Sequence, residues 1–218
     1  MMKTQTIKRG LFSLLMICLL TFSLSAEGLT LEGVCKSLAS HPNTSGDFKQ
    51  TKTLQTNGRK LTSTGKFIFC PLGILWQTEK PFPSSLILTE DAMIQIAANG
   101  KKSVMSGKDN QIFANISATL SSVFSGNAEE LKKNFTCKFE GDSKGAWKLY
   151  LTPKDSTIAA VMKSLVLAGT FEEGSAAGAL LTTLEMTEMS DNTILYEFAN
   201  QKYPKELSAD EKQNFVTD

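Results

Sequence analysis

Apolar and polar residues alternate along most of this chain with the two-residue period of a β-strand. In residues 147–152, for example, Trp147, Leu149 and Leu151 share one side of the backbone, and residues 193–199 repeat the alternation. Successive side chains of a strand point to opposite faces of a sheet, so each such segment has one apolar face and one polar face. The pattern predicts a protein built mainly from antiparallel strands.

Turn residues divide this pattern into short strands joined by short connections. Asn57-Gly58 and Asn99-Gly100 are typical of tight hairpin turns, and the polar pair Glu90-Asp91 separates two apolar segments. The chain lacks the helix–strand rhythm that builds parallel sheets. The predicted strands are residues 48–54, 61–70, 74–78, 86–96 (divided at Glu90-Asp91), 135–139, 147–152, 165–168, 184–189 and 193–199.

Helical spacing of apolar residues is limited to short segments. One predicted helix begins at Leu31 and ends at His41-Pro42, and residues 113–124 carry apolar side chains at helical spacing. Because so few helices cannot cover the apolar faces of the predicted strands, we expect the sheet to curl into a barrel or half-barrel. Further short helices are predicted at residues 128–134, at residues 158–162 and from Ser208 onward.

The N-terminus has the features of a secretory signal peptide. Lys3, Lys8 and Arg9 form a basic region, the apolar run Leu11–Leu24 follows, and we expect cleavage after Ala26. The run is shorter than the roughly 20 apolar residues that a membrane-spanning helix needs. We therefore divide the chain into a signal peptide (residues 1–26), a folded domain (27–203) and a polar C-terminal tail (204–218).

Charge and composition argue against several functions. The chain has 23 Lys and Arg against 22 Asp and Glu, and cleavage removes three basic residues, so the mature net charge is −2. We expect no nucleic-acid binding, which requires positive charge concentrated on one face. The single histidine, His41, and the absence of a close Cys pair argue against a metal site and a His-dependent triad. Without nucleotide-binding or nucleophile-elbow motifs, we expect no cofactor and no enzymatic activity.

Three cysteines remain after the expected cleavage: Cys35, Cys70 and Cys137. In an oxidising compartment at most one internal disulfide can form among three thiols. Cys70 and Cys137 both lie in predicted strands and are the favoured pair. Alternatively, all three are small buried apolar side chains.

Short motifs in both halves of the chain form an ordered series. The first half contains Asp47-Phe48-Lys49-Gln50-Thr51, Thr64-Gly65, Pro71-Leu72-Gly73-Ile74-Leu75-Trp76 and Lys80-Pro81. The second half contains Trp147-Lys148-Leu149-Tyr150-Leu151-Thr152-Pro153-Lys154, Asp191-Asn192-Thr193 and Phe198-Ala199-Asn200. The series resembles the LolA family of periplasmic outer-membrane lipoprotein carriers, and the resemblance extends from about residue 31 to residue 200.

This resemblance implies a half-open antiparallel β-barrel of about eleven strands with short lid helices, as in LolA and LolB. It also implies a periplasmic carrier that shelters the acyl chains of lipoproteins, or of related acyl lipids, in an apolar cavity. Such a carrier would take its cargo from an inner-membrane transporter, touch membranes only transiently and pass the cargo to an outer-membrane acceptor, acting as a monomer.

One position departs from the family pattern. The better-known carriers have an arginine just before the tryptophan of the Pro71–Trp76 motif, and that arginine hydrogen-bonds the lid shut; this chain has Leu75. The hydrogen bond that closes the lid in those carriers therefore cannot form here. Either apolar contact alone holds the lid or the cavity is more open, and we expect Leu75→Arg to tighten the lid if Leu75 faces the cavity.

The candidate ligand-binding residues are apolar side chains of the predicted strands and lid. Among them, methionines suit an adaptable lining. Two alternatives remain: a lipid-sensing regulatory module on the same fold, and an acyl-transferring enzyme that uses one of the cysteines. The candidate cavity and lid residues are Phe67, Phe69, Leu75, Trp76, Ile87, Met93, Ile116, Leu120, Phe124, Leu149, Leu151, Met186, Tyr196 and Phe198.

Overall fold

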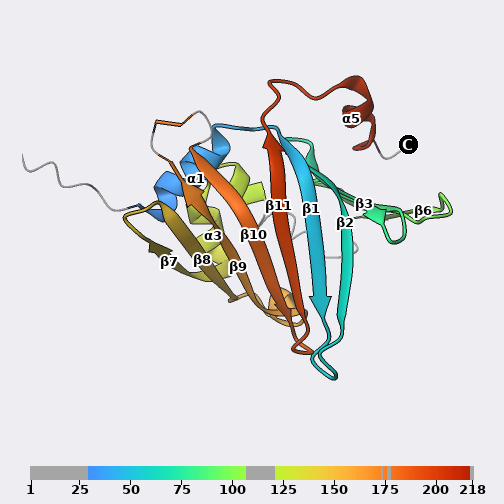
Figure 1. The fold of residues 1–218 in the computed structure, drawn as a ribbon, viewed down its shortest axis with the longest axis horizontal. Coiled ribbons are helices and arrows are strands. Elements are labelled where there is room, and N and C mark those ends of the chain that lie inside the picture. The colour runs from blue at the N-terminus through green and yellow to red at the C-terminus, as the bar shows by residue number, and fades with distance from the viewer. Residues whose placement is uncertain (1–28, 107–120, 173, 176–177, 217–218) are drawn as a thin grey trace, which may run out of the picture.

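The structure is a computed structural model that describes residues 29–106, 121–172, 174–175 and 178–216. The signal peptide expected at residues 1–26 lies outside these residues, as do the candidate lid residues Ile116 and Leu120. Within the described residues, eleven strands form one open antiparallel sheet in the order β6-β5-β4-β3-β2-β1-β11-β10-β9-β8-β7 (Figure 1). The prediction of a strand-dominated antiparallel fold is confirmed.

Ten of the eleven described strands fall where the sequence predicts them, but residues 102–106 were not predicted as a strand, and the strands predicted from residues 165 and 184 begin at Met162 and Ala179. Turn residues lie where the sequence indicates them: Gly58 and Gly100 both have positive φ (67° and 78°), which a residue without a Cβ adopts readily. The strands are β1 (Thr44–Thr53), β2 (Lys60–Cys70), β3 (Gly73–Lys80), β4 (Ser84–Leu88), β5 (Ala92–Ile96), β6 (Lys102–Ser106), β7 (Phe135–Gly141), β8 (Ala146–Pro153), β9 (Met162–Phe171), β10 (Ala179–Glu188) and β11 (Thr193–Lys202).

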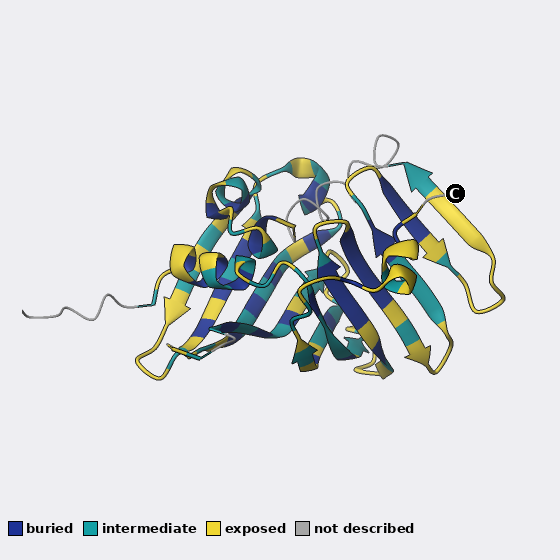
Figure 2. Ribbon diagram, turned by 90° about the horizontal axis from the view of Figure 1, so that it is seen from above, coloured by how far each residue is buried: buried dark blue, intermediate teal, exposed yellow. Residues whose placement is uncertain are grey.

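The sheet has two wings that meet at a central pair of strands. The first wing, β2–β6, and the second wing, β7–β10, are each a series of antiparallel neighbours in chain order. Between them β1 pairs with β11, for example through Phe48 and Phe198. Viewed from above, the sheet is bent, and β6 and β7 lie at its two far edges (Figure 2).

Short helices begin at capping residues that the sequence supplies. The side chain of Thr30 accepts a hydrogen bond from the backbone N–H of Gly33, and that of Asp155 accepts from Thr157 and Ile158. Residues 121–124 are also helical. The helices with defined ends are α1 (Leu31–Ala39), α3 (Ala128–Asn134), α4 (Ser156–Ala159) and α5 (Ala209–Gln213).

The main core lies on one face of the sheet, which we call the inner face. The helices α1, α3 and α4 contribute Val34, Leu131 and Ile158 to this core, where they pack with apolar residues from both wings. Ser37 Oγ of α1 accepts a hydrogen bond from the N–H of Ala179 on β10 (2.8 Å). The helices α1 and α3 therefore lie beside the second wing (Figure 1).

The opposite, outer face of the first wing carries a second core. Ile68, Ile87 and Ile94 of β2, β4 and β5 pack there with Leu207 and Phe215, which flank α5. The C-terminal tail is therefore polar in most positions but is anchored by two buried apolar side chains. As a result, β2–β5 of the first wing bury apolar residues on both of their faces.

Candidate functional site

A group of aromatic side chains covers the middle of the inner face. Phe67 and Phe69 of β2 contact Phe198 of β11, with ring centroids 4.9 and 5.7 Å apart. Trp76 of β3 lies 5.8 Å from both Phe69 and Tyr196. We call this surface the aromatic floor; it consists of Phe48, Phe67, Phe69, Trp76, Tyr196 and Phe198.

Strand register explains why these rings meet. Phe67 pairs with Trp76 across β2 and β3, and alternation puts Phe69 on the same face. Phe67 reaches Phe198 over β1 because Gly46 lies between them: a Cβ at Gly46 would stand 2.9 Å from Cε1 of Phe67 and 2.7 Å from the carbonyl oxygen of Ala199. The missing side chain of Gly46 thus lets the two halves of the floor touch.

A row of apolar residues continues the floor into the second wing. Leu149 pairs with Leu167, Leu167 with Leu184, and Leu184 with Tyr196 across four neighbouring strands. Leu151 and Met186 belong to the same core, and so does Met93 in the first wing. The structure therefore gathers most of the described candidate residues on one continuous apolar face.

The segment around Phe124 covers part of this face. The ring of Phe124 lies 4.3 Å from that of Phe69, and Val123 is fully buried. A cavity of about 380 Å³ opens beside this contact, where Phe69, Phe124 and Ile74 form apolar walls and Ser125 lies at the polar side. This volume is in the range of small-molecule sites, about 300–1,000 Å³.

The indole of Trp76 is the polar exception on the aromatic floor. Its side chain is buried, and within the described part of the chain Nε1 has no hydrogen-bond partner. The other tryptophan, Trp147, is also buried, but its Nε1 donates to the carbonyl oxygen of Thr170 (3.1 Å). No pattern in the sequence distinguishes the two indoles.

Two predicted cavity residues lie on the other face of the sheet, which corrects the sequence prediction. Leu75 and Ile87 belong to the outer core with Leu207 and Phe215, whereas Trp76 belongs to the inner core. Adjacent strand residues point to opposite faces, so Leu75 cannot share the cavity side with Trp76. The tail, not a lid, covers Leu75.

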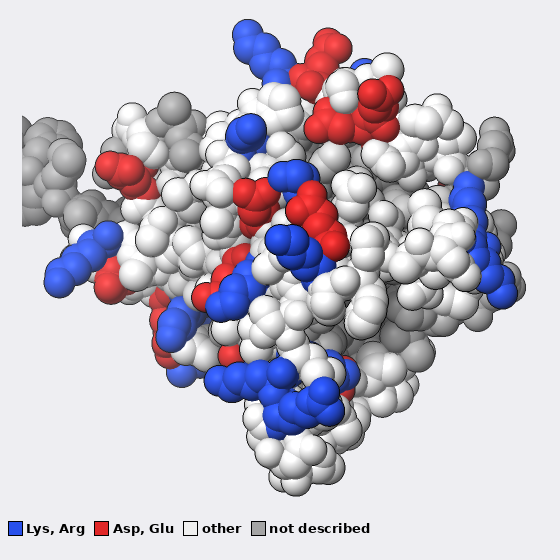
Figure 3. Space-filling model, turned by 45° about the vertical axis from the view of Figure 1, so that its right-hand side comes forward, with Lys and Arg blue, Asp and Glu red and all other residues white. Residues whose placement is uncertain are grey.

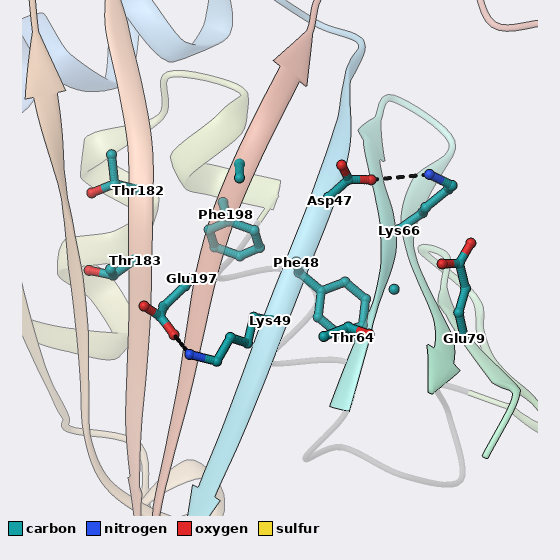
Figure 4. A pocket seen from close by; sticks show the side chains of 12 residues that line it. Asp47, Phe48, Lys49, Thr64, Lys66, Glu79, Thr182, Thr183, Glu197 and Phe198 are labelled. Carbon is teal, nitrogen blue, oxygen red and sulfur yellow. Dashed lines mark hydrogen bonds and ion pairs between the residues drawn. The ribbon is translucent and has the colours of Figure 1, made fainter. Parts of the chain in front are cut away.

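Charged residues of the central strands line a groove on the outer face. They alternate with Phe48 and Phe198, and they form the ion pairs Lys49–Glu197 (3.0 Å) and Lys66–Asp47 (3.1 Å) around a volume of about 760 Å³ (Figure 4). Lys, Arg, Asp and Glu are interspersed over the middle of the face shown in Figure 3. Because these exposed charges neutralise one another, the apolar inner face is the stronger candidate site.

Cys35, Cys70 and Cys137 are free thiols that pack in or against the two apolar cores. Burial raises the pKa of Cys35 to about 11, and it raises the pKa of Cys70 and Cys137 as well. A nucleophilic cysteine needs the opposite, a depressed pKa that populates the thiolate. The Cys70–Cys137 disulfide does not form in this structure; the alternative of small apolar side chains fits the positions of all three.

The described residues offer neither a metal site nor a membrane-spanning helix. Within those ranges, no group of three or more His, Cys, Asp or Glu side chains could hold a metal ion. The same part of the chain has no helix that is long and apolar enough to cross a membrane. The ring of His41 stacks on Tyr203, with centroids 4.2 Å apart.

The bent, open antiparallel sheet and its partly covered apolar face define a β-protein organised around a hydrophobic interior. The profile of the family described as "Outer membrane lipoprotein carrier protein LolA" matches residues 40–213, and the chain belongs to this family. Members of the family are periplasmic carriers and not enzymes. The search of curated proteins returned no match.

Two solved structures are similar to this chain at low sequence identity. A DUF1329 family protein from Desulfovibrio piger is 12% identical with a TM-score of 0.50, and the match covers 86% of this chain and 95% of that one. A LolA superfamily protein from Nitrosomonas europaea is 9% identical with a TM-score of 0.44, and the match covers 87% and 98% of the two chains.

Proposed function

We propose that this protein is a periplasmic carrier that binds the acyl chains of lipoproteins or related lipids against its inner face. It receives them at the inner membrane from a transporter and delivers them to an acceptor at the outer membrane. The observation that carries this proposal is the aromatic floor with a cavity of about 380 Å³ beside Phe124. Family membership supports the same role.

Apolar contact suffices to hold an acyl chain. Each buried methylene contributes about 0.8 kcal/mol, so a long chain that is fully enclosed would leave very slowly. A carrier must release its cargo, and therefore part of the cover over the floor has to move. The segment with Phe124 suits this role because it is short: in its described residues, 121–125, Phe124 contacts Phe69, and only Ser122 and Val123 are buried.

Filling the cavity tests the proposal. Ser125 lies at the cavity and is exposed, so Ser125→Trp should place an indole in the space that an acyl chain would use without replacing a buried side chain. We expect this variant to bind a neutral fluorescent acyl ester, such as the methyl ester of pyrenedecanoic acid, at least tenfold more weakly than the unsubstituted chain.

The matched control places the same indole in an exposed turn. Ser143 lies between β7 and β8 and is exposed, so Ser143→Trp should bind the probe with unchanged affinity. Circular dichroism checks that both variants are folded. Equal binding by all three proteins, or the absence of acyl lipids in native mass spectra of protein purified from periplasm, would contradict the proposed function.

A further inference from the structure

The unpartnered indole of Trp76 points to the part of the cargo that this protein recognises. Trp76 has 8% of its surface exposed, and within the described residues Nε1 has no hydrogen-bond partner. A buried donor without an acceptor destabilises the structure, because it loses water and gains nothing in exchange. The inference drawn here rests on the proposed function.

The rest of the chain shows that this fold can satisfy a buried indole. Trp147 is 2% exposed and donates to the carbonyl oxygen of Thr170 at 3.1 Å. Trp76 instead lies among the rings of Phe69 and Tyr196, at centroid distances of 5.8 Å. Ring faces are weak acceptors compared with a carbonyl oxygen.

The surroundings of Trp76 define which acceptor would suit it. The acceptor must arrive attached to an apolar chain, since the adjoining surface is the aromatic floor. It must also be uncharged, because the buried apolar side chains around Trp76 would leave an anion without hydrogen bonds or a counter-charge. Burial raises the pKa of the neighbouring Tyr196 for the same reason. A bridging water would need two to four polar partners, which ring faces do not supply.

We propose that Trp76 Nε1 donates a hydrogen bond to the acyl carbonyl oxygen of the cargo, an ester or an amide. The alkyl chain beyond that carbonyl then lies on the aromatic floor. Trp76 acts as a specificity residue: it favours acylated molecules over ethers and hydrocarbons of equal length. Because a glycerolipid offers the carbonyl as an ester and an N-acylated protein offers it as an amide, both belong to the same chemical class.

Paired ligands that differ only at the carbonyl test this assignment. Monopalmitoylglycerol and its hexadecyl ether have the same chain and head group, and palmitoyl ethanolamide supplies the amide. We expect the unsubstituted chain to prefer the ester to the ether by about three- to tenfold, the effect of one neutral hydrogen bond. Trp76→Phe keeps an aromatic ring but removes the donor, so the preference should disappear. Trp147→Phe should retain it.

A spectroscopic measurement on the unsubstituted protein avoids any dependence on the variants. The chain has two tryptophans, so ¹⁵N-labelled indole gives two N–H signals, and Trp147 serves as an internal reference. The Trp76 proton should move downfield with the ester or the amide and much less with the ether, while the Trp147 proton stays in place.

The outcomes separate the two proposals. If ester and ether bind equally to the unsubstituted chain and the Trp76 proton does not respond, the role of Trp76 is wrong while the carrier function stands. If none of the three ligands binds, the carrier function fails. A response to the amide alone identifies an amide carbonyl as the recognised group, and a response to the ester alone identifies an ester carbonyl.

Discussion

Single residues decide how the two halves of the inner face meet, and Gly46 is the clearest case. Its missing Cβ leaves room for Phe67 to contact Phe198 across β1. Glycine in a strand commonly marks a close approach of this kind. The sequence alone does not reveal this role, because no pattern in the residues next to Gly46 indicates that the ring of Phe67 lies against its backbone.

Gly46→Ala should therefore destabilise the protein. The added methyl would stand 2.7 Å from the carbonyl oxygen of Ala199, so either the strand or the ring of Phe67 must shift. We expect the free energy of unfolding to fall by about 1–3 kcal/mol, the usual effect of overpacking. Urea denaturation measures this change. Ser45→Ala, one residue earlier and partly exposed, should change it by less than about 0.5 kcal/mol.

Glu188 joins the end of β10 to β1 through a partly buried ion pair. Burial raises the pKa of this carboxyl group, but hydrogen bonds from Lys52 Nζ (2.6 Å) and Asn192 Nδ2 (2.8 Å) outweigh it, so the pKa lies below its usual value. A depressed carboxyl pKa contributes stability above the unfolded pKa of about 4.3, and this contribution is lost as the pH falls through the folded pKa.

Glu188→Gln should lower the free energy of unfolding by about 0.5–1 kcal/mol at neutral pH. The difference from the unsubstituted chain should shrink below pH of about 4 and vanish once the folded carboxyl is protonated. Urea denaturation across this pH range tests the prediction. Glu185→Gln, exposed on the same strand, is the matched control and should change the free energy of unfolding by less than about 0.5 kcal/mol at neutral pH. A difference for Glu188→Gln that stays constant across this pH range would contradict the ion-pair explanation.

At the scale of elements, the sequence predicts the strands better than it predicts their faces. Along β7–β11 the alternation is regular, and the apolar row through Leu149 and Tyr196 follows from it. In β2–β5 both faces are buried, so Ile74, Leu75 and Trp76 are all apolar and alternation cannot say which points inward. The missing information lies far away in the sequence, in the tail.

A usable signal was nevertheless present in that tail. Leu207 and Phe215 flank a short charged helix, and isolated large apolar residues in a polar segment indicate docking onto an apolar surface. The capping box at Ser208 and Glu211 fixes the start of α5 and hence the spacing of the two anchors. By contrast, no sequence signal identifies the unpartnered indole of Trp76.

Leu75→Arg, which sequence reasoning associates with a tighter lid, should instead release the tail. The charged side chain would enter the outer core beneath Leu207 and Phe215, and this core consists of apolar side chains. We expect a loss of about 2–4 kcal/mol in the free energy of unfolding. Hydrogen exchange should accelerate across residues 205–216, and affinity for a neutral acyl probe should change less than twofold.

Gln77→Arg is the matched control, because Gln77 is exposed two residues further along β3 on the same face. It should leave both stability and exchange nearly unchanged. If Leu75→Arg altered acyl-probe binding while the tail stayed protected, Leu75 would have to act on the inner face and the assignment of the two cores would be wrong.

At the scale of the whole molecule, β11 is the element that joins the two wings. A chain ending at residue 190 lacks β11, so β1 and β10 both lose a neighbour and the aromatic floor loses Tyr196 and Phe198. We expect this chain to show no cooperative urea transition and little near-ultraviolet circular dichroism.

A chain ending at residue 203 tests the alternative explanation that any C-terminal truncation is damaging. It keeps all eleven described strands and loses only the tail with α5. We expect it to unfold cooperatively with reduced stability, because the outer core loses Leu207 and Phe215. If the chain ending at residue 190 also unfolded cooperatively, the wings would be independent units.

The pairing of β1 with β11 also governs when the chain can fold. Each wing consists of hairpins between strands that are neighbours in sequence, and such local contacts form quickly. The pairing of Phe48 with Phe198 joins residues far apart in the sequence, so it forms only after β11 has been synthesised. Until β11 forms, the free edges of β1 and β10 and the apolar face of the incomplete sheet stay exposed to proteases and to other unfolded chains. The intermediate most exposed to proteolysis and aggregation is accordingly the chain in which both wings have formed but β11 has not yet paired with β1.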